Sequence, residues 1–181
     1  MSRPGLPLPV KPVVSMLLAR EDLAPGILHN LAEHFGPPDL VSSWLPFSFT
    51  EYYSPEMGPH LGRVLVAFLH LADPGHLDRW KVFTNAIEER LALGGKRTVN
   101  LDPGYVARER LILASGKNFT HRVYLDQGIY GDLTLIYSGG KFSSLSWTFP
   151  DYAQGPVPEL VDLVRRKYLW QLKALSNTVS Q

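Results

Sequence analysis

The sequence predicts an α+β fold, in which a ferredoxin-like βαββαβ core is extended by a helix, a three-stranded antiparallel meander and a C-terminal helix. Two nearly continuous apolar runs, at residues 13–19 and 64–71, each precede an amphipathic helical pattern and predict the core. Alternating segments joined by short glycine turns after residue 120 predict the meander. The length of 181 residues suits one domain, and 45% hydrophobic against 19% charged residues is typical of a globular protein.

The predicted organisation is a tail, one domain and a second short tail. Residues 1–12 contain four prolines and predict an extended N-terminal segment. The α+β domain is expected over residues 13–175, with the ferredoxin-like half at 13–101 and the half with the meander and last helix at 102–175. Residues 176–181 are expected to form the C-terminal tail.

The first strand is predicted at 13–19, because an apolar run of this length is typical of a strand buried on both faces. A helix follows at 24–35, where Leu28, Leu31 and Phe35 share one face and Gly36 provides the stop. Residues 41–50 then alternate between two faces, which predicts a second strand. Pro46 has no backbone N–H to donate, so this strand is expected at an edge of the sheet.

A third strand is predicted at 64–71, and a long helix then begins at Asp73, with Asp as N-cap and Pro at the first helical position. Its helical periodicity buries one face and exposes the other. The side chains expected to face water are Asp78, Arg79, Lys81, Glu88 and Glu89. A short strand at 98–101 completes the βαββαβ order, with strands one and three central and strands two and four at the edges.

Asp102-Pro103-Gly104 repeats the pattern of Asp73-Pro74-Gly75, which predicts a helix over 103–115. The apolar run at 111–114 leaves a strand there as the alternative. The meander strands are expected at 121–125, 129–137 and 141–149, and the last helix begins near Pro158.

The two meander turns also predict which residues lie opposite one another. With a loop at 126–128, Leu125 pairs with Ile129, Tyr124 with Tyr130, and Arg122 with Asp132; with a loop at 139–140, Tyr137 pairs with Phe142 and Asp132 with Trp147. One face therefore combines charged, hydroxyl and aromatic groups, as in the wall of a ligand pocket: Arg122, Tyr124, Tyr130, Asp132, Thr134 and Trp147. The other face is apolar, includes His121 and is expected to lie under a helix. The alternative is that Arg122 and Asp132 form an ordinary cross-strand ion pair.

A second cluster is predicted at one end of the sheet. If strands two and four both run antiparallel to strands one and three, their C-terminal ends share one edge, where loops often hold binding or catalytic groups. The residues expected there are Thr50, Glu51, Tyr52, Tyr53, Arg63, Asn100, Asp102 and Tyr105. For Asp102, capping of the following helix is the alternative role.

Lys117, His121 and Arg122 bring three possible cations within six residues and could contact an anionic ligand. The alternatives are a solvated loop lysine at 117 and a hydrogen-bonded core histidine at 121. Asp151 follows the last strand and could either bind ligand or stabilise a turn. If the protein is an enzyme, Asp102 and His121 are the predicted acid–base residues.

Several function classes are disfavoured. The chain has no cysteine, and it lacks the P-loop, GxGxxG, HExxH and GxSxG patterns. No spacing signature predicts a metal site, and the sequence names no cofactor. A net charge of +1 disfavours nucleic acid held by phosphate contacts, and no apolar run approaches the ~18 residues that span a bilayer. A cytoplasmic location is expected.

Seven segments together resemble one family. They are 47–53 (FSFTEYY), 56–58 (EMG), 99–105 (VNLDPGY), 113–117 (LASGK), 121–125 (HRVYL), 128–130 (GIY) and 147–152 (WTFPDY). These motifs resemble the bacterial and archaeal family known as domain of unknown function 4416, over nearly the whole chain from Lys11 to the last helix. The resemblance implies a small single-domain protein and brings no activity with it.

The expected function is binding of a small anionic or nucleotide-like ligand, with enzymatic activity left open. The alternatives are a module that stacks single-stranded RNA on aromatic side chains and a protein-interaction domain with unknown partners. The predicted ligand-binding residues are Glu51, Tyr52, Asn100, Tyr105, Lys117, Arg122, Tyr124, Asp132, Trp147 and Asp151.

Overall fold

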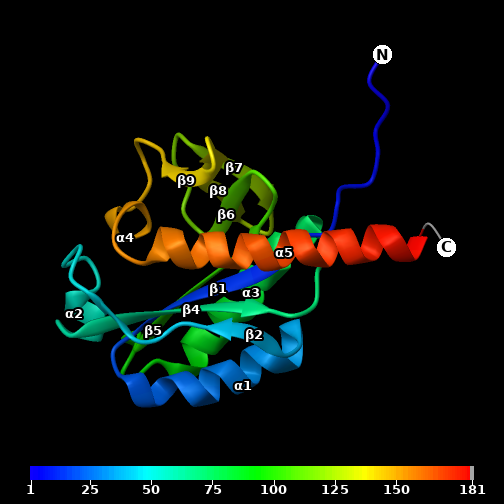
Figure 1. The fold of residues 1–181 in the computed structure, drawn as a ribbon. Helices are drawn as coiled ribbons and strands as arrows, with labels where there is room; N and C mark the ends of the chain where they lie inside the picture. Colours follow the sequence, from blue (N-terminus) through cyan, green and yellow to red (C-terminus); the bar gives the residue numbers. More distant parts are fainter. Residues whose placement is uncertain (180–181) are drawn as a thin grey trace.

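An antiparallel sheet of nine strands forms the middle layer of the part of the chain that the computed structural model describes, residues 1–179 (Figure 1). The strands are β1 (Lys11–Leu18), β2 (Pro38–Val41), β3 (Leu45–Phe47), β4 (Leu61–Phe68), β5 (Val99–Val106), β6 (Arg110–Ser115), β7 (Arg122–Asp126), β8 (Ile129–Ser138) and β9 (Lys141–Ser144). Their order is β2-β4-β1-β5-β6-β8-β7, with β3 also paired to β4 and β9 to β8. The predicted α+β class is confirmed.

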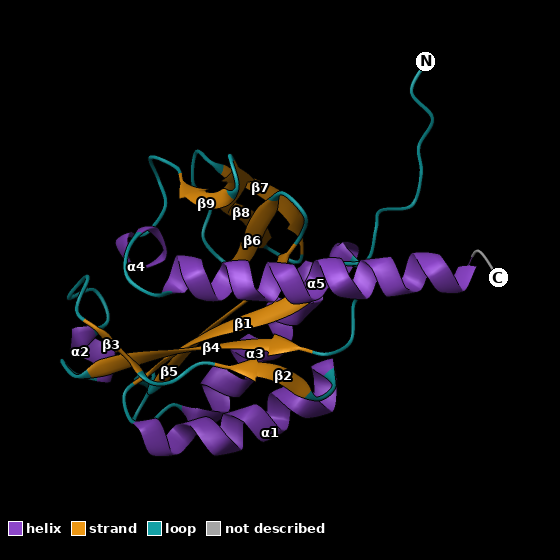
Figure 2. Ribbon diagram, viewed as in Figure 1, coloured by secondary structure: helices purple, strands orange, loops and turns teal. Residues whose placement is uncertain are grey.

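Helices cover both faces of the sheet (Figure 2). They are α1 (Ala24–Phe35), α2 (Ser54–Met57), α3 (Leu77–Leu91), α4 (Pro150–Ala153) and α5 (Val157–Val179), with short 3₁₀ helices η1 (Glu21–Leu23) and η2 (Pro74–His76). α1 and α3 pack on one face through Leu31 and Trp80, whereas α5 packs on the other through Val161 and Val164. Each face therefore has its own apolar core.

β1 and β4 each have a paired strand on both sides, and every one of their residues is buried, as a continuous apolar run predicts. β4 occupies 61–68, three residues earlier than the predicted 64–71. The cap at Asp73 is confirmed, since its side chain accepts a hydrogen bond from the Gly75 N–H at 2.8 Å. This cap begins η2, which leads directly into α3.

The predicted helix over 103–115 is wrong, because this segment contains the end of β5 and all of β6. Asp102 lies inside β5 opposite Ser15, so it caps no helix. A Cβ on Gly104 would lie 2.3 Å from the Ile112 carbonyl oxygen. This glycine permits the close approach of β5 and β6, and the apolar run at 111–114 fills the sheet between the two cores.

The second predicted strand is two short strands, β2 and β3, that lie beside β4 at one edge of the sheet. The predicted strand directions are right for the pairs β1–β5 and β2–β4 and wrong for the other pairs of the predicted core. β4 and β5 both run antiparallel to β1, and β2 runs antiparallel to β4, so strands one and two of the predicted core share a direction. The fourth strand is no edge either, because β5 pairs with β1 and with β6.

The meander registers are largely confirmed. Arg122 lies opposite Asp132, Tyr124 opposite Tyr130, and Tyr137 opposite Phe142. The predicted pair of Leu125 with Ile129 is wrong, because Asp126 takes that place and Leu125 forms a bulge next to a two-residue turn. β9 ends at Ser144, so Trp147 lies beyond the strand and does not pair with Asp132.

The predicted tails are shorter in the structure. β1 begins at Lys11, and the backbone of Val10 already exchanges hydrogen bonds with that of Ala72. α5 continues to Val179, through most of the predicted C-terminal tail, and residues 180–181 lie outside the described part of the chain.

Candidate functional site

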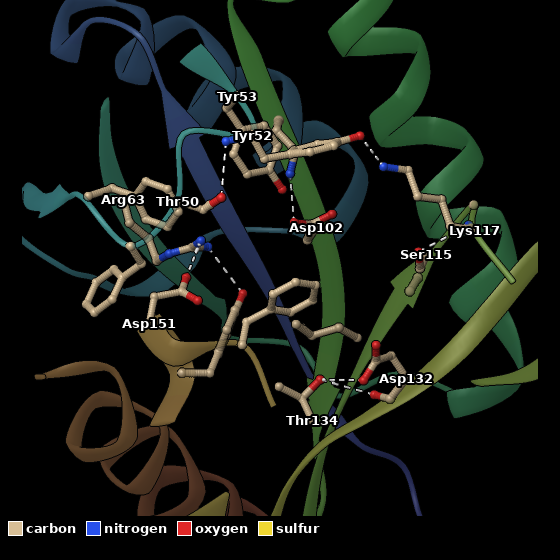
Figure 3. Close-up of a pocket in the computed structure, with 18 of the residues that line it drawn as sticks. Thr50, Tyr52, Tyr53, Arg63, Asp102, Ser115, Lys117, Asp132, Thr134 and Asp151 are labelled. Carbon is tan, nitrogen blue, oxygen red and sulfur yellow. Dashed lines mark hydrogen bonds and ion pairs between the residues drawn. The ribbon is translucent and has the colours of Figure 1, made fainter. Parts of the chain in front are cut away.

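A cavity of about 590 Å³ opens where β5 and β6 diverge (Figure 3). The two strands pair only where residues 104–106 face 111–113, so among the described residues no strand pairs with 99–103 on that side. The Thr50–Tyr53 loop, the start of β4, the end of β6, the strands β7 and β8 and the 149–152 segment complete the walls. The volume falls within the range of small-molecule sites.

Side chains of α3 replace the missing strand along β5. Glu88 Oε1 accepts a hydrogen bond from the Leu101 N–H at 2.8 Å, and Lys81 Nζ donates to the Leu101 carbonyl at 2.6 Å. Lys81 also forms an ion pair with Asp102 at 3.2 Å. Burial alone would lower the pKa of Lys81, but the carboxylates of Asp102 and Glu88 outweigh it and raise that pKa, so Lys81 is charged. These contacts occupy the hydrogen-bond donors of the Lys81 ammonium group.

The predicted exposure of three α3 side chains is therefore wrong. Asp78, Lys81 and Glu88 are all buried, because their carboxylates and ammonium group find partners on β5 and in the β7–β8 turn. The spacing of 78, 81, 85 and 88 marks one polar stripe on the helix. This polar stripe is the feature of the sequence from which the buried polar face of α3 could have been predicted.

One side of the cavity holds a buried guanidinium. Arg63 forms an ion pair with Asp151 at 2.5 Å, donates to the Tyr152 hydroxyl at 3.2 Å and also bonds the Ser15 hydroxyl. The guanidinium carbon lies 5.3 Å from the centroid of the Phe47 ring and 5.0 Å from that of Tyr152. Burial raises the pKa of Asp151 despite the opposing charge of Arg63. Figure 3 shows this pair on the side of the cavity away from Lys117.

The opposite side is the predicted polar face of the meander. Arg122 Nε donates to Asp132 Oδ2 at 2.8 Å, and His121 Nε2 lies 3.3 Å from the same oxygen. Trp147 stacks on the His121 ring at 5.1 Å and donates from Nε1 to the Leu133 carbonyl at 2.9 Å. His121 thus shares a face with Asp132, and its predicted place on the apolar face is wrong, because it precedes β7 and turns back toward the carboxylate.

Lys117 lies at the mouth of the cavity. Its ammonium group donates to the Tyr52 hydroxyl and sits 4.5 Å from the centroid of that ring. The hydrogen bond from Lys117 lowers the pKa of Tyr52. Within residues 1–179, no carboxylate forms an ion pair with Lys117, in contrast to Arg63, Lys81 and Arg122. Lys117 is thus the cavity-lining cation that remains available to an anion.

Seven of the predicted site residues line the cavity: Tyr52, Asn100, Asp102, Lys117, Arg122, Asp132 and Asp151. The cluster at the sheet end forms for a different reason from the predicted one. β5 runs antiparallel to β1, as predicted, but β2 and β3 run in the same direction as β1, so the first residues of β5, and not its last, reach the Thr50–Tyr53 loop. Asn100 Nδ2 donates to Asp102 Oδ2 at 2.7 Å within this group.

The other five predicted residues lie outside the cavity wall: Glu51, Tyr105, His121, Tyr124 and Trp147. Tyr105 is near the far end of β5, opposite Pro12. Tyr124 packs against Tyr130 with ring centroids 5.5 Å apart, and Glu51 is exposed.

Several residues of the wall were not predicted from the sequence: Phe47, Phe49, Lys81, Asn85, Leu113, Ala114, Ser115, Gly116, Phe149, Pro150 and Tyr152. Six aromatic rings line the space in total: Phe47, Phe49, Tyr52, Tyr53, Phe149 and Tyr152. Asn85 lies on α3 beside Lys81, and none of the described residues hydrogen-bonds its amide. Among residues 1–179, no group of three or more His, Asp and Glu side chains is placed to hold a metal ion.

The fold and the cavity define an α+β domain with a pocket that is lined by aromatic and charged side chains where β5 and β6 diverge. The chain belongs to the family described as Domain of unknown function (DUF4416), whose model matches residues 8–168. No curated protein and no solved structure matches the chain. In the described part of the chain, none of the helices is long and apolar enough to cross a membrane.

Proposed function

We propose that this protein binds a small planar anion in the cavity between β5, β6 and the Thr50–Tyr53 loop. The observation that supports this proposal most is that the four cations in the cavity wall differ in whether they have a carboxylate partner. Arg63, Lys81 and Arg122 each have a carboxylate partner, whereas within residues 1–179 the Lys117 ammonium group has no carboxylate partner and donates to the Tyr52 hydroxyl. A carboxylate, sulfonate or phosphate that enters the mouth would gain a charge-assisted contact with Lys117.

The aromatic lining indicates the shape of the ligand. Six rings around one space favour a flat body that stacks or packs edge-to-face against them. The free amide of Asn85 offers both a donor and an acceptor to such a body from the α3 side. A nucleotide-like compound or an aromatic acid satisfies all three conditions.

The wider fold supports a small ligand over single-stranded RNA. We read the order β2-β4-β1-β5 as a ferredoxin-like core, and RNA-binding domains of that kind use an open sheet face. Here α5 packs on one face of the sheet and α1 and α3 pack on the other (Figure 2). Acid–base catalysis by Asp102 stays a prediction; Asp102 faces the cavity and accepts hydrogen bonds from Lys81 and Asn100.

Two fluorescent probes test the proposal. Anilinonaphthalenesulfonate is an aromatic anion, and phenylnaphthylamine is nearly the same molecule without the sulfonate. We expect the native protein to bind both probes saturably. Lys117→Gln removes the ammonium group, so it should lower the affinity for the sulfonate probe by about tenfold and change the affinity for the neutral probe by less than about twofold. A tenfold change in affinity corresponds to about 1.4 kcal/mol, as expected for one charge-assisted contact.

Lys141→Gln is the matched control, because Lys141 is exposed at the start of β9 and does not line the cavity. It should leave the affinity for both probes unchanged. Equal affinity of the native protein and Lys117→Gln for the sulfonate would contradict the proposal. Equal weakening by Lys141→Gln would assign the effect to overall charge and contradict it as well.

A further inference from the structure

β5 contains a proline although it is an interior strand of the sheet. Pro103 lies in β5, which pairs with β1 on one side and with β6 on the other. Proline has no backbone N–H, so within sheets it is found mainly where no ladder hydrogen bond is lost. Its presence here indicates that one of the two ladders of β5 is interrupted at residue 103.

The direction of the backbone groups on β6 identifies the atom that loses its hydrogen bond. The Ala107 N–H donates to the Arg110 carbonyl at 2.9 Å, so the backbone groups of Arg110 face β5. Backbone groups alternate in direction along a strand, so those of Ala114, four residues further on, face β5 as well. The Ala114 carbonyl therefore needs its donor from β5.

Pro103 stands where that donor would be. The pairing of Gly104 with Leu113 is the last in the β5–β6 ladder, and the next step places Pro103 opposite Ala114. Because proline has no N–H, the Ala114 carbonyl receives no hydrogen bond from β5. Among residues 1–179, no side chain and no loop N–H donates to this carbonyl either.

This carbonyl belongs to the wall of the cavity. Ala114 is 2% exposed and lines the cavity at the point where the two strands diverge. A buried carbonyl that lacks a donor is uncommon in folded proteins. Lys117 follows Ala114 by three residues, which is ~10 Å of extended backbone. Figure 3 shows Ser115 and Lys117 next to each other at this end of β6.

We propose that the ligand of the cavity carries an O–H or N–H group on its ring system and donates it to the Ala114 carbonyl. This inference rests on the proposed function and narrows the ligand from planar anions in general to hydroxy- or amino-substituted aromatic acids. The anionic group contacts Lys117 at the mouth, and the donor lies on another edge of the rings. Pro103 then has a function of its own, because it keeps the carbonyl available.

Hydroxynaphthalenesulfonates and their methoxy counterparts test the inference, by displacement of anilinonaphthalenesulfonate. The two series share the rings, the sulfonate and the oxygen atom, and they differ in the donor. We expect at least one hydroxyl isomer to bind the native protein about fivefold more tightly than its methoxy counterpart, as one neutral hydrogen bond provides. Equal affinities at every ring position would overturn the inference while the Lys117-dependent binding of sulfonates stands. Absence of any binding would contradict the proposed function itself.

Pro103→Ala supplies the missing N–H to the Ala114 carbonyl and should reduce the preference for the hydroxyl compound to less than about twofold. Pro150→Ala is the matched control, because Pro150 also lines the cavity but lies at the start of α4, outside any strand. The control should keep the preference. A preference that survives in Pro103→Ala, or that both variants lose equally, would overturn the inference.

An isotope label in the alanine carbonyls provides a readout in the native protein, without any substitution. A hydrogen bond to a carbonyl changes its NMR frequency, so the Ala114 signal should shift with the preferred hydroxyl compound and much less with its methoxy counterpart. A signal that responds alike to both compounds would overturn the inference.

Discussion

The four cations of the cavity wall have different hydrogen-bond and ion-pair partners, and these partners determine which cation can bind a ligand. Lys81 and Arg63 are buried among fixed acceptors, and taking either away from its carboxylate would leave an unpaired buried charge. Lys117 is exposed and its partner is one hydroxyl, so an incoming anion can replace that partner at little cost. The sequence alone does not show which of the two lysine ammonium groups already has partners. The packing of α3 against β5 shows that the ammonium group of Lys81 already has its partners on β5.

Tyr53 supplies a pH-dependent prediction at the same scale. Burial raises the pKa of its phenol to about 12 from the ordinary 10.0. Between these values the folded state keeps the proton while the unfolded state loses it, so the free energy of unfolding falls as the pH rises through this window. Tyr53→Phe has no proton to lose, and its unfolding free energy should fall less steeply over that range.

Denaturant titrations of the native protein and Tyr53→Phe from neutral pH to pH 12 measure this difference. The two stability curves should converge or cross toward alkaline pH. Parallel curves over the whole window would mean that the Tyr53 phenol titrates alike in the folded and unfolded states.

At the scale of elements, local patterns predicted the strands and helices whose burial follows one simple period. β1, β4, α1 and the β7–β8 hairpin were found for this reason. The helix predicted after Asp102 was wrong because Asp-Pro-Gly is also compatible with a strand, provided that the neighbouring strand can approach the glycine closely. The direction of β5, which brings Asn100 and Asp102 to the cavity, depends on long-range pairing that no local pattern contains.

The close approach of β5 and β6 gives a prediction about that element pair. A Cβ on Gly104 would meet the Ile112 carbonyl at 2.3 Å, so Gly104→Ala must push the strands apart and should destabilise the protein by about 1–3 kcal/mol. Gly116→Ala is the matched control in the next loop, because a Cβ there meets nothing within 4 Å. Thermal unfolding of both variants measures the effect, and a Gly104→Ala protein as stable as the control would contradict this account of the strand junction.

At the scale of the whole molecule, the cavity exists because the sheet opens between β5 and β6 while helices close both of its faces. α3 lines the opening with Lys81 and Asn85, and the 149–152 segment before α5 places Asp151 and Tyr152 across from it. Seven predicted site residues meet there although they come from separate parts of the chain. Four of the wall residues that the sequence did not predict are aromatic, namely Phe47, Phe49, Phe149 and Tyr152, and an aromatic residue in a periodic pattern is equally typical of an ordinary core.

A crystal structure of the protein with anilinonaphthalenesulfonate tests the central claim most directly. The ring system should lie among the aromatic side chains of the cavity, with a sulfonate oxygen within hydrogen-bonding distance of Lys117 Nζ and the Lys117–Tyr52 contact replaced or shared. A probe that leaves the cavity empty and binds elsewhere, for example beside the exposed Trp170 on α5, would contradict it.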